Sequence, residues 1–426
     1  MQRRIILFGL AAALLTGASS CADESPMLPG EFPPGAQPVT REVLVPASQF
    51  FRVLSSHSGY TSVHAAQYLT VAENYEGLNA HALGRFLRFP QQVTYLRDGV
   101  SRTDSLYTIT GGSLVLRVDT TASTTQPFTL RVFQGVQDYD PGSATWQLAV
   151  DTGNVEVPFT EPGGTRGALL GQASRPAGTP GDSVVFPLTP ATLRALTDST
   201  SNGVVITGTE AGTRLRITSF VLRARVRPDS ARPDTTFVIS ASGTDAVTVY
   251  TPEQPEPGAG IVAAGGVRGA RTLLEIDVDQ RVPGCPATQT CADVGLRDVQ
   301  LNSVELLLKP VNVPNGFGPV GVLPLHLRRV TEPELGRQAP LGCCAPGDPA
   351  GLLDQPVFYN PTTDTLAVIP LTQLALQTTF SSDTLPTTFA LLSELGPGPP
   401  TFGVGFFRGD PLLRIVYTLP ARRRLP

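Results

Sequence analysis

The chain has 426 residues, of which 41% are hydrophobic and 16% charged, with 42 glycines and 40 prolines. This length suffices for two or three domains with cores of their own, and the many turn-forming residues favour short strands over long helices. The formal net charge of −4 argues against a nucleic-acid-binding surface and against a polybasic membrane patch.

Residues 1–21 start with the basic sequence MQRR, continue with the apolar run IILFGLAAALLTGA and end in SSC. The run is too short to span a membrane as a helix. This order resembles a bacterial lipoprotein signal peptide, which implies that Cys21 becomes the lipidated N-terminus of the mature protein. Ala22 favours an outer-membrane or cell-surface location, with a periplasmic or secreted protein as the alternative.

Residues 22–41 are rich in proline and lack periodic apolar positions. This composition predicts an extended tether between the lipid and the folded part of the chain.

Five segments of the remaining chain recur in the same order about 190 residues later, a spacing too long for a solenoid repeat. The pairs are 81–86 with 271–276, 112–118 with 302–308, 129–133 with 324–328, 184–196 with 367–379, and 214–218 with 412–416. We therefore expect two copies of one domain, residues 42–227 and 236–420, joined by a linker at 228–235 and followed by a basic tail at 421–426.

Within each copy, short runs alternate apolar and polar residues, as in SLVLRV at 113–118. A period of two between turn-forming clusters indicates half-buried antiparallel strands. The predicted fold class is all-β, with two tandem jelly-roll-like antiparallel β-sandwiches.

One segment of each copy has a different pattern. After the strand 184–186, Thr189 is suited to cap a helix and Pro190 to occupy its first position, while Leu193 and Leu196 share one face. In the second copy, Thr372 and Leu374 repeat the pattern, so each sandwich is expected to carry a short helix over its core.

The segments HALGRF (81–86) and RTLLEI (271–276), the pair Thr145–Trp146, the two PLT segments and the closing strands near Leu215 and Leu413 together resemble the DNRLRE family. These are jelly-roll-like β-sandwich domains of secreted bacterial and archaeal proteins. The resemblance implies a non-catalytic module, and it implies polysaccharide as a ligand because some relatives bind carbohydrate.

Four cysteines besides Cys21 lie in the second copy: Cys285, Cys291, Cys343 and Cys344. An even number in an exported protein indicates disulfides. Three pairings are open, and we expect bridges between the 285/291 and 343/344 loops because adjacent cysteines rarely bond each other. A zinc site is the alternative, but C-x₅-C and C-C are not its usual spacings.

No motif for nucleophilic or zinc hydrolysis occurs in the sequence: G-x-S-x-G, S-x-x-K and H-E-x-x-H are all absent. The sequence GAGIVA at 258–263 follows a proline-rich run rather than a strand, which argues against a dinucleotide site. Carboxylate pairs for glycoside cleavage are defined in space rather than in sequence and stay open. We expect no enzyme activity and no cofactor.

A sugar-binding site needs exposed aromatic faces. Trp146 and Tyr139, in QDYDPGSATWQ, are the best candidates, followed by Tyr60 and Tyr75; the alternative is that Trp146 packs in a core. Asp277 and Asp279 form a candidate for a structural calcium site.

Two functions remain open for a protein held to a membrane by its N-terminal lipid. One is a surface lipoprotein that binds polysaccharide. The other is a structural, scaffold or adhesive envelope lipoprotein with other envelope proteins as partners. Exposed aromatic patches would favour the first, and buried aromatic side chains the second.

Overall fold

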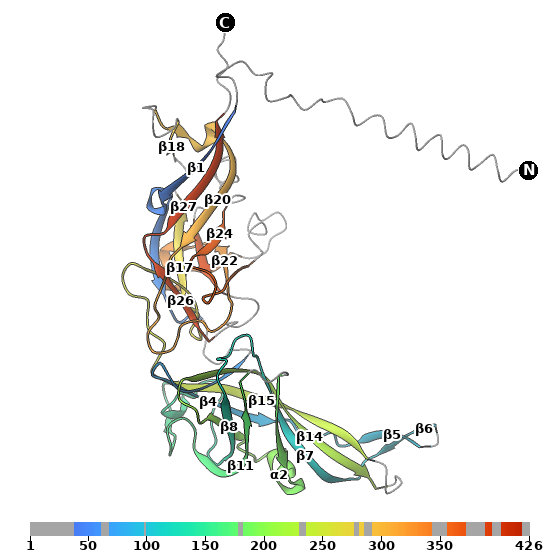
Figure 1. Cartoon of the computed structure of the whole chain (residues 1–426). Helices are drawn as coiled ribbons and strands as arrows, with labels where there is room; N and C mark the ends of the chain where they lie inside the picture. The colour runs from blue at the N-terminus through green and yellow to red at the C-terminus, as the bar shows by residue number, and fades with distance from the viewer. Residues whose placement is uncertain are drawn as a thin grey trace, which may run out of the picture.

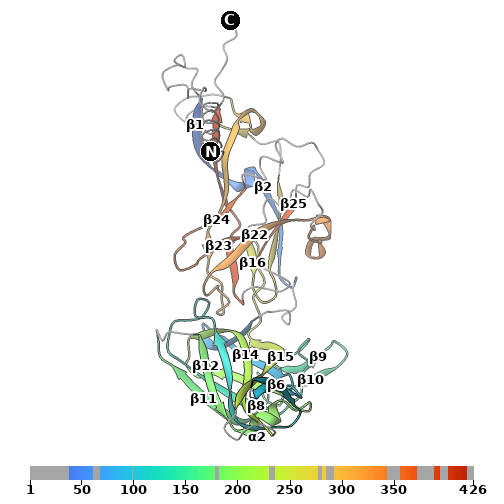
Figure 2. The ribbon, with the colours of Figure 1, turned by 90° about the vertical axis from the view of Figure 1, so that its right-hand side faces the viewer.

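The computed structural model describes residues 38–60, 68–97, 99–177, 182–229, 236–276, 281–284, 292–342, 356–371, 388–393 and 402–419. These residues form two β-sandwiches that lie one above the other in both views (Figures 1 and 2). Their strands pair in antiparallel fashion in both sandwiches. The predicted all-β fold class is confirmed.

The first sandwich spans residues 69–251 and consists of one sheet that folds over on itself, in the order β11-β8-β13-β4-β15-β14-β7-β12, with β3 paired to β14 and β4. Two hairpins, β5–β6 and β9–β10, extend from it. The strands are β3 (Leu69–Tyr75), β4 (Leu78–Phe86), β5 (Val93–Arg97), β6 (Val100–Asp104), β7 (Tyr107–Val118), β8 (Phe128–Gly135), β9 (Leu148–Asp151), β10 (Glu156–Pro158), β11 (Arg166–Arg175), β12 (Ser183–Leu188), β13 (Val204–Gly208), β14 (Thr213–Pro228) and β15 (Phe237–Thr251).

Strand β14 shows why one face of the sheet is apolar and buried. Leu222, Ala224 and Val226 are buried, whereas the arginines between them are exposed, because successive side chains of a strand point to opposite faces. The buried side chains meet those of β7, β8, β12 and β13 in one apolar core between the two layers.

The predicted helix of the first copy is α2, Pro190–Leu196. The Thr189 hydroxyl caps it by accepting a hydrogen bond from the backbone N–H of Thr192 at 3.1 Å, and Leu193 and Leu196 are buried against the core. This prediction is confirmed. Its counterpart around Thr372 and Leu374 lies outside the described residues.

The second sandwich combines residues 39–57 with residues 261–419. One sheet has the order β1-β27-β20-β24, the other has the order β2-β17-β25-β22-β23, and a small sheet β16-β26-β21 adjoins them. The elements are β1 (Val39–Pro46), η1 (Ala47–Gln49), β2 (Phe51–His57), β16 (Ile261–Gly265), β17 (Arg271–Ile276), β18 (Arg281–Val282), β19 (Val294–Gly295), η3 (Leu296–Asp298), β20 (Gln300–Leu308), β21 (Pro310–Val311), β22 (Leu323–Arg329), η4 (Pro333–Gln338), β23 (Val357–Tyr359), β24 (Ala367–Pro370), β25 (Thr388–Leu392), β26 (Val404–Arg408) and β27 (Leu412–Leu419).

The two sandwiches share one pairing pattern. The order β14-β7-β12 in the first corresponds to β27-β20-β24 in the second, and β4-β13-β8-β11 corresponds to β17-β25-β22-β23. Four of the five recurring sequence segments fall on strands with equivalent partners: β4 and β17, β7 and β20, β8 and β22, β12 and β24. The repeat seen in the sequence is therefore a repeat of architecture.

The fifth correspondence is wrong in register. Leu413 lies opposite Leu306 of β20, but Leu215 lies opposite Val71 of β3. The counterpart of β27 is the later part of β14, from Ser219 on, which pairs with β7. The buried apolar positions of β14 change phase between Ile217 and Phe220, at the irregularity after Ile217, and the second copy breaks the same path into the separate strands β26 and β27.

Strand pairing also differs from the expected domain boundaries at 42–227 and 236–420. Strands β1 and β2 pair with β27 and β17 of the second sandwich, and β15 pairs with β14 and β4 of the first. Each copy thus gives its opening strand segment to the other sandwich. Local sequence does not decide this, because the choice depends on which distant sheet edge the strand meets.

Candidate functional site

The tryptophan predicted to bind sugar lies on the outer face of the first sandwich. Its ring is half-buried and packs on His81 of β4, with ring centroids 4.7 Å apart. The backbone N–H of Gly163 donates to the Trp146 carbonyl at 2.7 Å. A Cβ on Gly163, whose φ is +84°, would lie 2.5 Å from the His81 ring, so only glycine allows this loop to close over the pair.

His81 is held as a neutral imidazole in this cluster. It is 7% exposed, and its Nδ1 lies 2.7 Å from the Gly163 carbonyl, to which it donates. Burial lowers the pKa of His81 to about 4, and the nearby Arg166 charge adds to the effect of burial while the carbonyl opposes it. The face of Trp146 that meets His81 is therefore part of a small packed cluster rather than a free platform.

Tyr139 is buried and is not the exposed ring that the sequence suggested. It is 3% exposed, the Arg85 guanidinium covers its ring at 4.4 Å, and its hydroxyl donates to the Asp245 carbonyl at 2.8 Å. Burial raises the pKa of its hydroxyl. The prediction is wrong because the loop that carries Tyr139 folds back onto the outer face of β4 and β15, where it forms a second apolar layer.

The other two predicted aromatic residues lie elsewhere. Tyr60, just after β2, is half-buried beneath the Arg271 guanidinium, 4.5 Å from its ring. Tyr75, at the end of β3, lies where the two sandwiches meet, with Arg214 over its ring at 5.2 Å. The structure places the four aromatic residues in three separate places, so they do not form one sugar-binding face.

The two sandwiches meet at a contact that we call the joint, where described residues of both pack together. It is an apolar core built by both of them, with members Ala72, Leu78 and Ala80 from the first and Ala263, Val267, Ala270, Val313, Phe317, Val404 and Phe406 from the second. Phe317 is fully buried and stacks on Phe402 with centroids 5.4 Å apart. Tyr250 of β15 meets both rings edge-on.

A buried arginine crosses this joint. Arg214 on β14 is 4% exposed and donates from Nη1 to the carbonyl of Gly316 in the second sandwich. Among the described residues, no carboxylate lies within ion-pair distance of it; its charge faces the rings of Tyr75 and Phe402, at 5.2 and 5.9 Å. Burial lowers the pKa of Arg214 to about 10, although Tyr75 and Glu76 oppose this.

The backbone of the second sandwich comes very close to the backbone of the first at this joint. Gly316 has a φ of +68°, and a Cβ at this position would lie 2.1 Å from the Tyr75 carbonyl oxygen. Gly321 is similar, since its Cβ would lie 2.3 Å from the Thr121 carbonyl oxygen. Only glycine fits where the backbones of the two sandwiches come so near.

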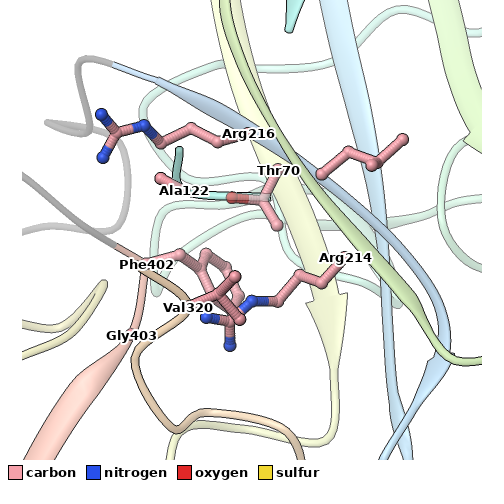
Figure 3. A pocket seen from close by; sticks show the side chains of 8 residues that line it. Thr70, Ala122, Arg214, Arg216, Val320, Phe402 and Gly403 are labelled. Atoms are coloured by element: carbon pink, nitrogen blue, oxygen red, sulfur yellow. The ribbon is translucent and has the colours of Figure 1, made fainter. Parts of the chain in front are cut away.

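A cleft opens beside Arg214 and is drawn in Figure 3. It has a volume of about 260 Å³, counting its open mouth, and its lining comes from both sandwiches: Thr70, Ala122, Arg214, Leu215, Arg216, Val320, Phe402 and Gly403. Arg214 extends toward Val320 and Phe402. The enclosed part has room for about one or two water molecules, which makes it a feature of the joint rather than a pocket for a sugar ring.

Arg216 is held at the edge of the same cleft. Its Nη2 donates to Asp119 Oδ2 at 2.5 Å, and its guanidinium lies 4.3 Å from the Tyr68 ring. Burial opposes ionisation of Asp119, but hydrogen bonds from Thr121 and the Arg216 charge outweigh it and lower the pKa of the carboxyl. Two arginines of one strand thus fix the end of the first sandwich in different ways.

Several predicted sites lie outside the described residues. These are Cys21, the four cysteines Cys285, Cys291, Cys343 and Cys344, and the calcium candidates Asp277 and Asp279. Within the described ranges, no group of three or more His, Cys, Asp or Glu side chains could hold a metal ion. No helix in these ranges is long and apolar enough to cross a membrane.

Sequence reasoning missed the joint. Arg214 and Arg216 belong to the segment RLRIT, whose alternation predicts that both side chains point to the solvent from an ordinary strand. The only signal was the glycine-rich segment NGFGPVG at 315–321, because loops of this kind allow close backbone approach.

Comparisons of this chain with family models, with curated proteins and with solved structures found no match.

Proposed function

We propose that this chain is a non-catalytic lipoprotein of the bacterial cell envelope that acts as a rigid structural element. The observation that carries this proposal is the joint, in which the two sandwiches share an apolar core and a buried arginine. Flexible domain pairs usually meet through smaller and more polar contacts. A joint packed like a core fits a protein whose task is to hold a shape.

The position of the strands supports a display role. Val39 of β1 pairs with Leu419 of β27, and this end of the second sandwich lies farthest from the first (Figure 1). If Cys21 carries the lipid, residues 22–38 would join the membrane to this end. The first sandwich, with its projecting β5–β6 hairpin, would then be held away from the membrane.

Polysaccharide binding is the second candidate, and the burial of the aromatic residues ranks it lower. Tyr139 is covered by Arg85, Trp146 packs on His81, and Tyr75 belongs to the joint. Trp146 is the one of these three whose ring keeps some exposure outside the joint. It is therefore the residue on which a test of sugar binding should be built.

The experiment has two arms. The untethered protein, residues 38–420, and its Trp146→Ala variant are assayed against a polysaccharide panel with and without EDTA, and we expect no binding by either. Binding that is lost in a folded Trp146→Ala variant would overturn the structural proposal in favour of the second candidate. In the other arm, full-length protein and Cys21→Ala are expressed with a labelled fatty acid; label on the parent alone supports the anchor, and equal label would contradict it.

A further inference from the structure

The two sandwiches are each completed by a strand from the other sequence copy. In the first, β15 pairs through residues 237–242 with β14 and through residues 243–251 with β4. In the second, β1 pairs with β27 and, after the short turn η1, β2 pairs with β17. Since β27 and β17 are the counterparts of β14 and β4, the segment β1–β2 is the counterpart of β15.

The chain order makes this an exchange. In chain order, the segment β1–β2 directly precedes the strands of the first sandwich, but it completes the second sandwich. Strand β15 directly precedes the remaining strands of the second sandwich, but it completes the first. A strand that leaves its own copy to complete another copy has the geometry of a domain swap. Here both partners happen to belong to one chain.

The two exchanged segments differ in how easily they could pair with a second molecule of this chain instead of with their own. Strand β15 is internal to its sheet, with β14 on one side and β4 on the other, and only residues 229–236 separate it from β14. Strands β1 and β2 each lie at the edge of their sheets. No residue of β1 or β2 belongs to the apolar core of the joint, so an exchange of the segment leaves that core in place. Gly59 and Tyr60, which follow β2, donate backbone hydrogen bonds to Arg268 and Gly269 of the second sandwich and would exchange together with the segment.

The segment is also lightly buried. No residue of β1 is buried, and the buried apolar residues that the segment adds to the core are Ala47, Phe50 and Phe51. The backbone ladders to β27 and β17 and the partly buried side chains of Val43 and Val45, which pack on the same core, complete its attachment. An equal ladder would form with the same segment of another molecule, because the receiving edges are identical.

We propose that β1–β2 is an exchangeable segment through which two copies of this chain form a strand-swapped dimer. In the dimer, β1–β2 of each molecule completes the second sandwich of its partner, and the joint of each molecule stays intact. The contacts are those of the monomer, so the dimer is favoured by concentration through mass action.

The test uses a cross-strand pair of full-length chains. Thr40 and Thr418 face each other across β1 and β27, with hydroxyl oxygens 2.8 Å apart. Thr40→Cys and Thr418→Cys are made on separate chains, mixed at increasing concentration, both natively and by refolding together from urea, and then oxidised. We expect a disulfide between positions 40 and 418 of different chains, identified by peptide mass spectrometry and found in the dimer fraction.

The matched control lies in the first sandwich. Arg223 and Ser240 face each other across β14 and β15 and are both exposed, but the short connection between these strands keeps the pair within one chain. Mixed Arg223→Cys and Ser240→Cys chains should give no interchain disulfide. A second pair, Arg52→Cys with Glu275→Cys across β2 and β17, covers the case in which the first pair disturbs folding.

The proposal is overturned if both mixed pairs of the second sandwich stay unlinked at every concentration, while the same two cysteines placed in a single chain close readily. That result would show that the edges can be bridged and that β1–β2 is never exchanged between molecules.

Discussion

The buried histidine of the first sandwich should make its stability depend on pH. His81 has a pKa of about 4 in the folded chain, against an ordinary value of 6.5. Because the unfolded chain binds this proton more readily, the free energy of unfolding should fall as pH drops from 6.5 towards 4. A difference of roughly 2.5 pKa units corresponds to a loss of about 3 kcal/mol at the acid end of this window.

The chain contains its own reporter for this prediction. Its single tryptophan lies 4.7 Å from the His81 ring, so urea unfolding followed by tryptophan fluorescence reports on the first sandwich. The measurement compares the parent with His81→Phe at pH 7.5, 6.5, 5.5 and 4.5. The variant loses the hydrogen bond to Gly163 at every pH, but it keeps an aromatic ring beside Trp146.

Carboxylates also titrate in this window, and they do so in both proteins. Subtracting the two stability profiles therefore isolates the imidazole. We expect the parent to be the more stable of the two at pH 7.5 and to lose about 2.5 kcal/mol relative to His81→Phe by pH 4.5. Parallel profiles from pH 7.5 to 4.5 would refute the reasoning, because they would show that His81 titrates normally in the fold.

Three further predictions concern the joint and the helix. Phe317→Ala removes a fully buried ring and should lower the free energy of unfolding by about 3–5 kcal/mol, with a loosened joint visible by small-angle scattering. The control Phe358→Ala, at a residue that is 58% exposed, should change neither quantity. Equal effects of the two substitutions would contradict the role of the joint. Gly316→Ala places a methyl group 2.1 Å from a carbonyl oxygen at positive φ and should destabilise the joint by about 1–3 kcal/mol; an unchanged scattering profile and melting temperature would argue against the close approach. Thr189→Ala removes the cap of α2 and should lower the free energy of unfolding of the first sandwich by about 1 kcal/mol, measured by urea unfolding with tryptophan fluorescence. Thr189→Ser retains a capping hydroxyl and should leave this free energy unchanged.

Much of the fold could be predicted from the sequence because it depends on local alternation. The buried apolar face of β14 follows from its period of two, and the cap and first turn of α2 follow from Thr189 and Pro190. The repeat was visible because equivalent strands need similar patterns to fill equivalent places in a core. The candidate site was predicted less well, since an aromatic residue in a loop can lie on the surface or fold back, as Tyr139 does.

The fold class, the capped helix of the first copy and four of the five repeated strand segments could be predicted from the sequence alone, because these rest on periodicity and on the conformational preferences of single residues. Three features became visible only in three dimensions: the exchange of β1–β2 and β15 between the copies, the packing of Trp146 on His81, and the entry of Arg214 into the joint. Each of these depends on contacts between residues far apart in the chain. Such contacts are chosen by the shape and unsatisfied hydrogen bonds of the receiving surface, which a local pattern does not encode.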